Sequence, residues 1–522
     1  MRTRCSERWV GLLPVRGGAL RFASLRFCGP RVKQMWLTVL VFCLAVAGLS
    51  NIAAASSTAT PQAPYLAFNS AAVGIASASA QQLTASFSVT GSDTLTAKLH
   101  YGIDYAAGPV SCVANGSGQT CTVPVTFTAT LPGARKDAVF LMDGATTLAT
   151  VYLGGVGQSP LALVQPGVVT QLISGATYTQ SESAVDENGT VYVFSNNGPA
   201  GSNVYSVTKA GVVSVVPVSV VAPTGIAIDG AGILYISHAA YSDELITWNT
   251  VTQTQGTVIP WPPNPVVACS LNELLYGVAS DSLGNIFTLE LNCGAVIEAT
   301  AAGGFIESSI DPAMNANPYW IAVDSADDIF FSCLDQINEV LANGNQSEVT
   351  NPGDSESSNL AVDAADTLYV SPHTGGGVAE LPASNYQASQ ALLDPMATPA
   401  GLGLGSDGTL YVGNPGTAAG VGNGNLDKVD RSQGAIAFGQ QVIGAASAAQ
   451  DVGIYNGGNE PLTISSITVT GASSGFDLQA AAVNNCAEGQ QIAPGESCQV
   501  AATLTPHTQA HSPEASSLPL TP

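Results

Sequence analysis

A segment present in six copies limits the fold of this chain more than any other feature. Each copy is a short apolar run, a tight turn and a second apolar run, as in AIDGAGILYIS at residues 227–237. Successive copies begin about 40 to 50 residues apart. Short strands at this period are typical of a β-propeller with one four-stranded blade per repeat. The other copies cover residues 184–195, 279–290, 322–333, 361–371 and 404–414.

The first five copies carry an aspartate where the first strand ends, and the sixth has Gly405 there. Aspartate suits this place because its carboxylate can accept backbone N–H groups of a tight turn. A calcium loop is the alternative, but the distal glutamate of such a loop is absent from the spacing. We therefore interpret these aspartates as structural turn residues: Asp186, Asp229, Asp281, Asp324 and Asp363.

The charge balance argues against nucleic acid as a partner. The net charge is −24, and eight of the 14 basic residues lie before Met35. Such an acidic surface repels phosphate backbones, so no nucleic-acid binding is expected.

The N-terminal region has the pattern of an export signal. Residues 36–49 are a continuous apolar run, too short for a transmembrane helix. Arg31 and Lys33 precede the run, and Ala53 to Ala55 follow it. We predict a signal peptide cleaved near Ser56, with Met35 as an alternative start to Met1. The mature protein is then secreted, periplasmic or cell-surface, with no integral membrane span.

The remaining chain predicts an all-β fold with a propeller between two sandwiches. Alternating apolar residues between 83 and 155 predict an antiparallel Ig-like β-sandwich. The expected segments are a leader at 1–55, a sandwich at 64–158, a six-bladed propeller at 165–432, a partial sandwich at 433–506 and a disordered tail at 507–522.

The second sandwich repeats only part of the first. Residues 436–458 match the opening of the first unit, and residues 497–508 match residues 117–132. The last two strands of the first unit have no copy, which predicts an incomplete sandwich with an exposed sheet edge. Truncation or a partner strand would explain such an edge.

Blade six needs a strand from elsewhere in the chain. After residues 425–430 the sequence runs directly into the second sandwich, so the blade lacks an outer strand. Residues 168–174 precede the first blade and belong to none. We predict that they close the ring as the outer strand of blade six, which pairs two otherwise exposed edges.

The cysteines predict two local disulfides, Cys112–Cys121 and Cys486–Cys498, as expected for an exported protein. Each such crosslink contributes roughly 2–3 kcal/mol in the chain-entropy model. Among Cys269, Cys293 and Cys333, we expect one further pair and one free thiol, and the pairing stays open.

Two resemblances follow from these residues. PTGIAIDGAGILYIS at residues 223–237 resembles an NHL repeat, although Trp320 stands at the glycine place of the fourth copy. The blades lack the basic residue of many NHL repeats, which speaks against anionic ligands. Residues 121–160 resemble the Ig-like choice-of-anchor D domains of exported bacterial proteins. Neither family has a single function.

The candidate site is one rim of the propeller, just past the second strand of each blade. Histidine and glutamate there suit Zn²⁺ or a general base, and some NHL propellers are lyases with such residues at this rim. His238, His373 and Glu290 are the metal candidates, with Zn or Ca as possible ions and no complete ligand set. The alternative is that these polar residues merely serve turns and solvent. The rim residues are Asn196, His238, Glu290, Cys333, His373 and Asn414.

The favoured function is a noncatalytic binding or scaffold protein at the cell surface. The rim would take a protein, peptide or glycan, with the sandwiches as spacers. The alternative is a metal-dependent propeller lyase or hydrolase acting at the same rim. The sequence has no nucleophile elbow, zinc-protease motif or phosphate-binding loop.

Overall fold

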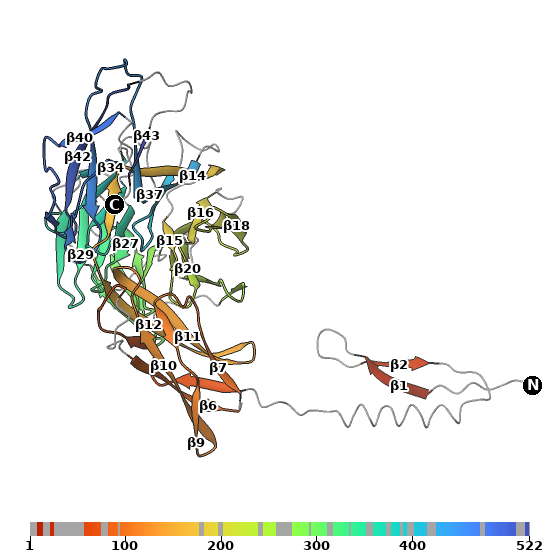
Figure 1. Cartoon of the computed structure of the whole chain (residues 1–522). Coiled ribbons are helices and arrows are strands. Elements are labelled where there is room, and N and C mark those ends of the chain that lie inside the picture. Colours follow the sequence, from red (N-terminus) through yellow and green to blue (C-terminus); the bar gives the residue numbers. More distant parts are fainter. Residues whose placement is uncertain are drawn as a thin grey trace, which may run out of the picture. The chain divides into compact units, whose positions relative to one another are not determined.

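The computed structural model divides into two compact units, residues 1–56 and 57–522 (Figure 1). In the first unit β1 (Arg8–Leu13) pairs with β2 (Arg21–Leu25). The predicted signal segment at 36–49 lies outside the described residues. Within them, no helix has the length and apolarity that a membrane crossing requires. The structure describes residues 8–13, 21–25, 57–74, 82–91, 94–176, 182–196, 202–238, 244–256, 274–291, 294–310, 317–333, 336–350, 359–371, 377–386, 390–393, 401–414, 424–469, 475–507 and 517–520.

The described part of residues 57–158 forms two five-stranded sheets that face each other. One sheet has the order β3-β6-β10-β8 with β9 beside β10, and the other has the order β4-β12-β11-β7 with β5 beside β12. Alternate residues such as Phe87, Val123 and Leu141 fill one core between them. The strands are β3 (Thr58–Pro61), β4 (Tyr65–Ala67), β5 (Ala71–Ala72), β6 (Gln82–Thr90), β7 (Leu95–Leu99), β8 (Tyr105–Ala107), β9 (Ser111–Asn115), β10 (Gly118–Phe127), β11 (Gly133–Asp143) and β12 (Thr146–Gln158). Strand β3 lies ahead of the predicted start at residue 64.

Each of the first five repeats forms a four-stranded antiparallel blade from strands that follow one another in the chain. Blade one is β15 (Ser183–Val185), β16 (Val191–Asn196), β17 (Ser202–Val207) and β18 (Val213–Val216), and blade two is β19 (Pro223–Ile228), β20 (Ile233–His238), β21 (Ile246–Asn249) and β22 (Thr254–Gln255). Blade three is β23 (Leu275–Ser280), β24 (Ile286–Glu290), β25 (Ala295–Ala299) and β26 (Phe305–Ser309), and blade four is β27 (Pro318–Val323), β28 (Ile329–Cys333), β29 (Gln336–Val340) and β30 (Gln346–Thr350). Blade five is β31 (Asn359–Val362), β32 (Leu368–Ser371), β33 (Val378–Leu381) and β34 (Gln390–Leu393).

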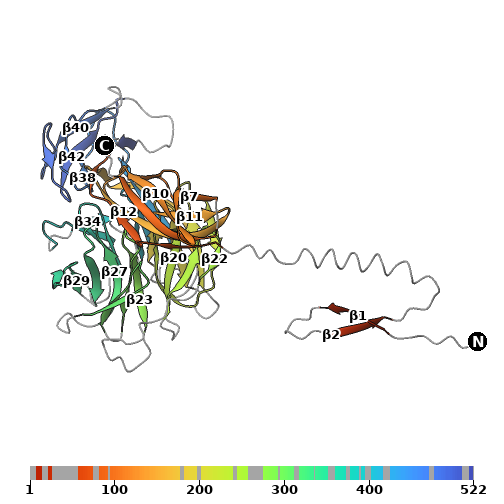
Figure 2. The same cartoon turned by 90° about the horizontal axis from the view of Figure 1, so that it is seen from below.

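The sixth blade closes the ring as predicted. It consists of β35 (Gly401–Leu404), β36 (Leu410–Asn414), β37 (Gly424–Ala437) and β14 (Gly167–Ala176). Strand β14 pairs antiparallel with β37, from Val168 opposite Asp430 to Ser174 opposite Asn425. Each inner strand contacts the next around the ring, and β35 contacts β15 again. Figure 2 shows two of these inner strands, β23 and β27, side by side. The described residues therefore form a closed six-bladed propeller.

The C-terminal unit includes a strand that lies between the first unit and the propeller in the sequence. Its main sheet has the order β13-β38-β42-β40, in which β13 (Ala162–Gln165) precedes the propeller in sequence. The other strands are β38 (Gln450–Asn456), β39 (Leu462–Thr463), β40 (Phe476–Ala480), β41 (Gln491–Ile492), β42 (Ser497–Leu504) and β43 (Ser517–Leu520). The predicted boundary at 432 falls inside β37, and β43 pairs with β37 where a disordered tail was predicted.

Both predicted disulfides, Cys112–Cys121 and Cys486–Cys498, are present. Cys333 is the free cysteine among the described residues, and it is buried. Cys269 and Cys293 lie outside the described residues.

Candidate functional site

The fixed aspartates hold the turns at one end of the propeller. Oδ1 of Asp229 accepts the backbone N–H groups of Ala231 and Ile233, at 2.9 and 2.8 Å. This carboxylate therefore satisfies turn donors that would otherwise be buried without partners. The same bond joins Asp186 to Thr190, Asp281 to Asn285, Asp324 to Asp328 and Asp363 to Thr367.

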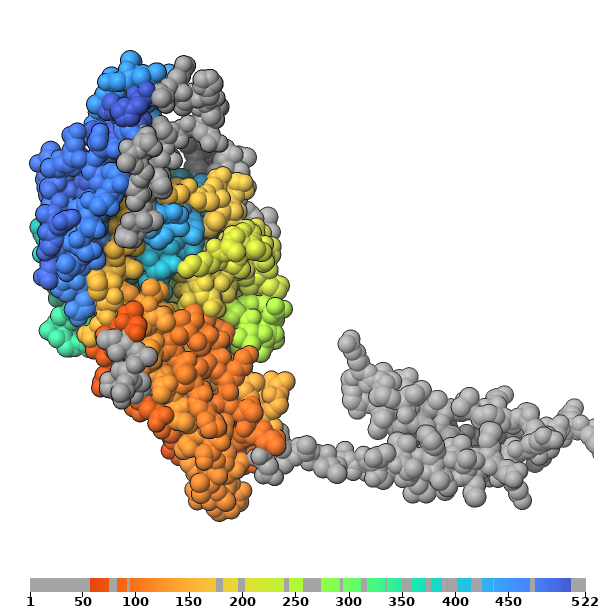
Figure 3. Space-filling view, in the orientation of Figure 1, coloured from red at the N-terminus to blue at the C-terminus, as the bar shows by residue number. Residues whose placement is uncertain are grey.

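Both flanking units lie on this Asp-turn end. The hydroxyl of Tyr152, on β12, donates to Oδ2 of Asp229 at 2.8 Å, and that of Tyr455, on β38, donates to Oδ2 of Asp363 at 2.7 Å. In Figure 3 the orange first unit and the blue C-terminal unit lie directly against the blades. The expectation that the sandwiches are mere spacers is therefore wrong, because they bury one end of the propeller.

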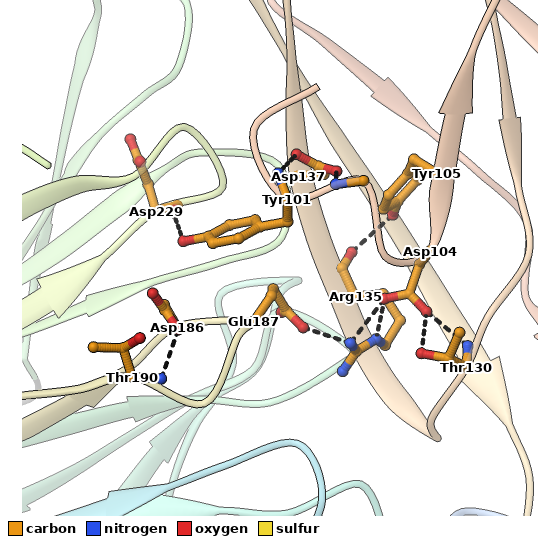
Figure 4. A network of polar contacts seen from close by, with 11 residues as sticks. Tyr101, Asp104, Tyr105, Thr130, Arg135, Asp137, Asp186, Glu187, Thr190 and Asp229 are labelled. Carbon is orange, nitrogen blue, oxygen red and sulfur yellow. Dashed lines mark hydrogen bonds and ion pairs between the residues drawn. The ribbon is translucent and has the colours of Figure 1, made fainter. Parts of the chain in front are cut away.

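A buried ion-pair network links the first unit to blade one (Figure 4). The guanidinium of Arg135 bonds Asp104 of its own unit at 2.7 Å and Glu187 of the propeller at 2.5 Å. All three side chains are withdrawn from solvent. Burial raises the pKa of Glu187 to about 7, and the cations Arg135 and Lys136 oppose that rise.

Blade six has a comparable buried link to blade five, and the C-terminal unit contacts it through Tyr455. Arg431, fully buried on β37, donates to the hydroxyl of Tyr369 at 2.7 Å and to Oε1 of Glu380 at 2.8 Å. Its guanidinium also lies over the ring of Tyr455. A buried cation paired in this way holds its partners in one arrangement, since separation would leave a charge without compensation.

Lys136 enters the mouth of the propeller at the same end. Its Nζ donates to the carbonyl of Ile228 at 2.7 Å and to Oγ of Ser280 at 3.1 Å. Burial lowers the pKa of Lys136, and the surrounding carboxylates oppose that fall. A cavity of about 190 Å³ remains beside it, and its charged lining consists of Lys136, Asp186, Glu187, Asp281, Asp324 and Asp363.

Glu182, just before β15, links the inner strands of three blades. Its Oε2 accepts the backbone N–H groups of Ile226 in blade two and Val278 in blade three, both at 3.1 Å. Burial raises the pKa of Glu182 to about 8. One carboxylate thus joins blades one, two and three.

Asn359 acts similarly on the other side of the ring, where its Oδ1 accepts the N–H of Leu402 in blade six at 3.0 Å. Neither Glu182 nor Asn359 was predicted as a site residue from the sequence. The available signal was their position, because Glu182 and Asn359 each stand four residues before the fixed aspartate, where blades two and three have Gly225 and Gly277.

The structure places the predicted rim residues at strand ends inside the blades. His238, Glu290 and Cys333 end the second strands of blades two, three and four, and each is buried. Burial lowers the pKa of His238, with Glu244 opposing the fall. Asn414 takes the equivalent place in blade six.

Asn196 ends β16 in blade one, and His373 lies outside the described residues. Among the residues that are described, no three His, Cys, Asp or Glu side chains form a group that could hold a metal ion. The metal candidates His238 and Glu290 are thus not brought together with a third such ligand.

Known proteins offer likeness at the level of the fold. No family model and no curated protein matches the sequence. A streptogramin B lyase structure is 13% identical, with a TM-score of 0.37 over 51% of this chain and 97% of that chain. A gluconolactonase from Xanthomonas campestris is 14% identical, with a TM-score of 0.41 over 52% and 95%. A regucalcin from Agrobacterium tumefaciens is 13% identical, with a TM-score of 0.39 over 51% and 95%. Such values carry no assignment of activity.

Proposed function

We propose that this chain is an exported, noncatalytic binding protein. Its propeller presents the rim formed by the loops between second and third strands to a protein, peptide or glycan. The observation that carries the proposal is that the two flanking units cover the Asp-turn end. A rigid ring held at one end leaves its opposite loops as the surface for a ligand.

The finer family assignment belongs to this proposal. The run of PTGIAID, a turn and ILYIS in blade two supports an NHL-type repeat. The shared sheet order of the first and C-terminal units supports choice-of-anchor D domains on both sides. On this view the flanking units fix the propeller in place.

Export is proposed from the apolar segment at 36–49 and is supported by the two disulfides. Disulfides persist in oxidising compartments. N-terminal sequencing of the secreted protein should find Ser56 or a neighbour as the first residue. Recovery of an intact Met1 form from the cytoplasm alone would contradict export.

The binding proposal is tested with peptide and glycan arrays on the purified mature protein. Once an array gives a ligand, His238→Ala combined with His373→Ala should weaken its binding at least tenfold. The matched control is Lys209→Ala, whose exposed side chain pairs with Asp407 at the Asp-turn end. Loss of binding in the Lys209→Ala control alone would place the ligand at the Asp-turn end and contradict the proposal.

The alternative, a metal-dependent lyase or hydrolase at the same rim, is separated by metal analysis. We expect no stoichiometric Zn²⁺ or Ca²⁺ in the purified protein. A bound metal that is lost on His238→Ala would favour the enzyme over the binding protein.

A further inference from the structure

The outer edge of blade one is an apolar strand. Strand β18 comes last in the order β15-β16-β17-β18, so it pairs with β17 on one side only (Figure 1). Its residues Val213 and Val215 are 41% and 60% exposed, and Val212 just before it is 59% exposed. Among the described residues, no strand lies on the outer side of β18. Aliphatic side chains beside unpaired backbone make such an edge a template for a further strand.

The register of β18 shows which of its backbone groups face outward. The N–H of Thr208 donates to the carbonyl of Val212 at 3.0 Å, so these two residues form a hydrogen-bonded pair. Val213 and Val215 lie one and three positions further along the same ladder. Because bonded and non-bonded pairs alternate in an antiparallel ladder, both belong to non-bonded pairs. The N–H and C=O groups of Val213 and Val215 therefore point away from β17.

The outer strands of the next three blades are better protected than β18. Strand β22 has only two residues, and β26 and β30 carry Glu307 and Glu348. Very short edge strands and edge charges prevent the strands of different molecules from pairing. Strand β18 has no charged residue, and Pro217 limits its open edge to residues 212–216 without covering it.

The distribution of charge identifies the partner as a second copy of the chain. Residues 188–228 contain no Asp, Glu or Arg, and their one lysine, Lys209, pairs with Asp407 at 2.8 Å. Strand β14, the outer strand of the neighbouring blade six, is also uncharged. The chain as a whole has a net charge of −24, so two copies repel each other across most of their surfaces. The neutral wall formed by β14 and β18 lets two copies approach without this repulsion.

The open edge is complementary to itself in an antiparallel pair. A two-fold axis through Ser214 places Val213 of one copy opposite Val215 of the other copy, and the reverse. Both positions have outward backbone groups, so both pairs can exchange main-chain hydrogen bonds. The valine side chains of each pair then lie next to each other on one face of the joined sheet.

We infer that two copies of this chain associate through antiparallel pairing of their β18 strands, centred on Ser214. The pairing joins blade one of each copy into one continuous sheet. Main-chain bonds set the register, and the exposed valines supply the apolar contact. This surface is separate from the propeller rim.

The association is measured by analytical ultracentrifugation of the purified mature protein over a range of concentrations. We expect a reversible equilibrium that shifts from monomer to dimer as the protein concentration rises. Salt should strengthen the dimer, because it screens the repulsion between two acidic molecules. Hydrogen exchange at residues 212–216 should slow in the dimer, since the outward N–H groups of Val213 and Val215 become bonded.

The deciding variant is Val215→Pro. Because the N–H of Val215 faces outward, proline there removes no bond within blade one, yet it blocks the partner strand. We expect it to weaken the dimer at least tenfold. Val213→Asp combined with Val215→Asp tests the same edge through charge repulsion, and it should also weaken the dimer at least tenfold. The matched control is Val442→Asp combined with Ile443→Asp, which changes exposed residues elsewhere and should leave the dimer intact.

Four results would overturn the inference. One is a native protein that stays monomeric at every protein and salt concentration, and another is a dimer that both β18 variants leave intact. The third is an equal loss in the Val442/Ile443 control, which would show nonspecific apolar association. The fourth is a dimer that salt weakens, which would show that charged groups make the contact.

Discussion

Near neutral pH, the carboxyl group of Glu182 is charged in the unfolded chain and protonated in the folded propeller. Its ordinary pKa is 4.5, and burial raises it to about 8 in the fold. The native state therefore retains a proton that the unfolded state loses, so the free energy of unfolding falls as pH rises from about 4.5 to about 8. Below pH 4.5 this contribution is fully present, and above pH 8 no further loss follows from this residue.

Glu182→Gln should remove this pH dependence while keeping an oxygen for the N–H groups of Ile226 and Val278. The variant should therefore gain stability relative to the native protein between pH 5 and pH 8, as measured by urea unfolding. Glu488→Gln, at an exposed position, is the control. If Glu182→Gln changed the free energy of unfolding by the same amount at pH 5 and at pH 8, the expectation would be contradicted.

The thiol of Cys333 should be inert in the native protein. Burial raises its pKa to about 12, so the reactive thiolate is scarce at neutral pH. We expect peptide mapping after iodoacetamide treatment at pH 8 to find Cys333 unmodified in the folded protein and fully modified in urea. Rapid labelling of the native protein would show that this strand end is open to solvent.

Residues with local partners were the ones that the sequence could predict. The turn aspartates bond groups two to four residues away, so one repeat is enough to interpret them. The partners of Glu182 lie 44 and 96 residues away, and Lys136 reaches Ser280 across 144 residues. Such pairs leave no pattern in a single sequence, because only the closed ring brings them together.

At the scale of elements, β11 fits closely against the turn of blade two. A Cβ at Gly230 would lie 2.5 Å from the carbonyl oxygen of Asp137, which is backbone and cannot move aside alone. Gly230→Ala should therefore destabilise the protein by about 1–3 kcal/mol and speed hydrogen exchange in β11. Gly439→Ala is the control, because nothing lies within 4 Å of its Cβ. Equal effects of the two changes would show that this contact is unimportant.

Strand placement was predictable where alternation and turns were strong. The predicted pairing of residues 168–174 with blade six is confirmed by β14 and β37. Strand β13 was missed because its four residues, ALVQ, carry no pattern of their own. The rim residues were predicted to lie just past the second strands. His238, Glu290 and Cys333 instead are the last residues of these strands, and they are buried.

At the scale of the whole molecule, we expect residues 57–522 to unfold in one thermal transition, because the first unit shares a buried ion pair with blade one and Tyr455 of the C-terminal unit bonds Asp363 of blade five. Arg135→Leu removes the cation that pairs directly with Asp104 and Glu187, which should cost about 3–5 kcal/mol and split the transition in two. Lys209→Ala removes an exposed pair with Asp407 and should cost less than about 1 kcal/mol. Differential scanning calorimetry measures both. A single unchanged transition in Arg135→Leu would contradict this coupling.

The pairing of β14 with β37 also sets an order of events in time. During synthesis, β14 is made before the strands of blades one to five. Strand β37 is made after them, more than two hundred residues later. At equilibrium the separation costs little, because loop-closure entropy grows only with the logarithm of length. Its effect is kinetic, since pairing between distant segments is slow and leaves strand edges uncovered meanwhile. We therefore expect closure to be a late step of propeller folding, and the interval before it to be when a newly made chain is most exposed to misassembly with its neighbours.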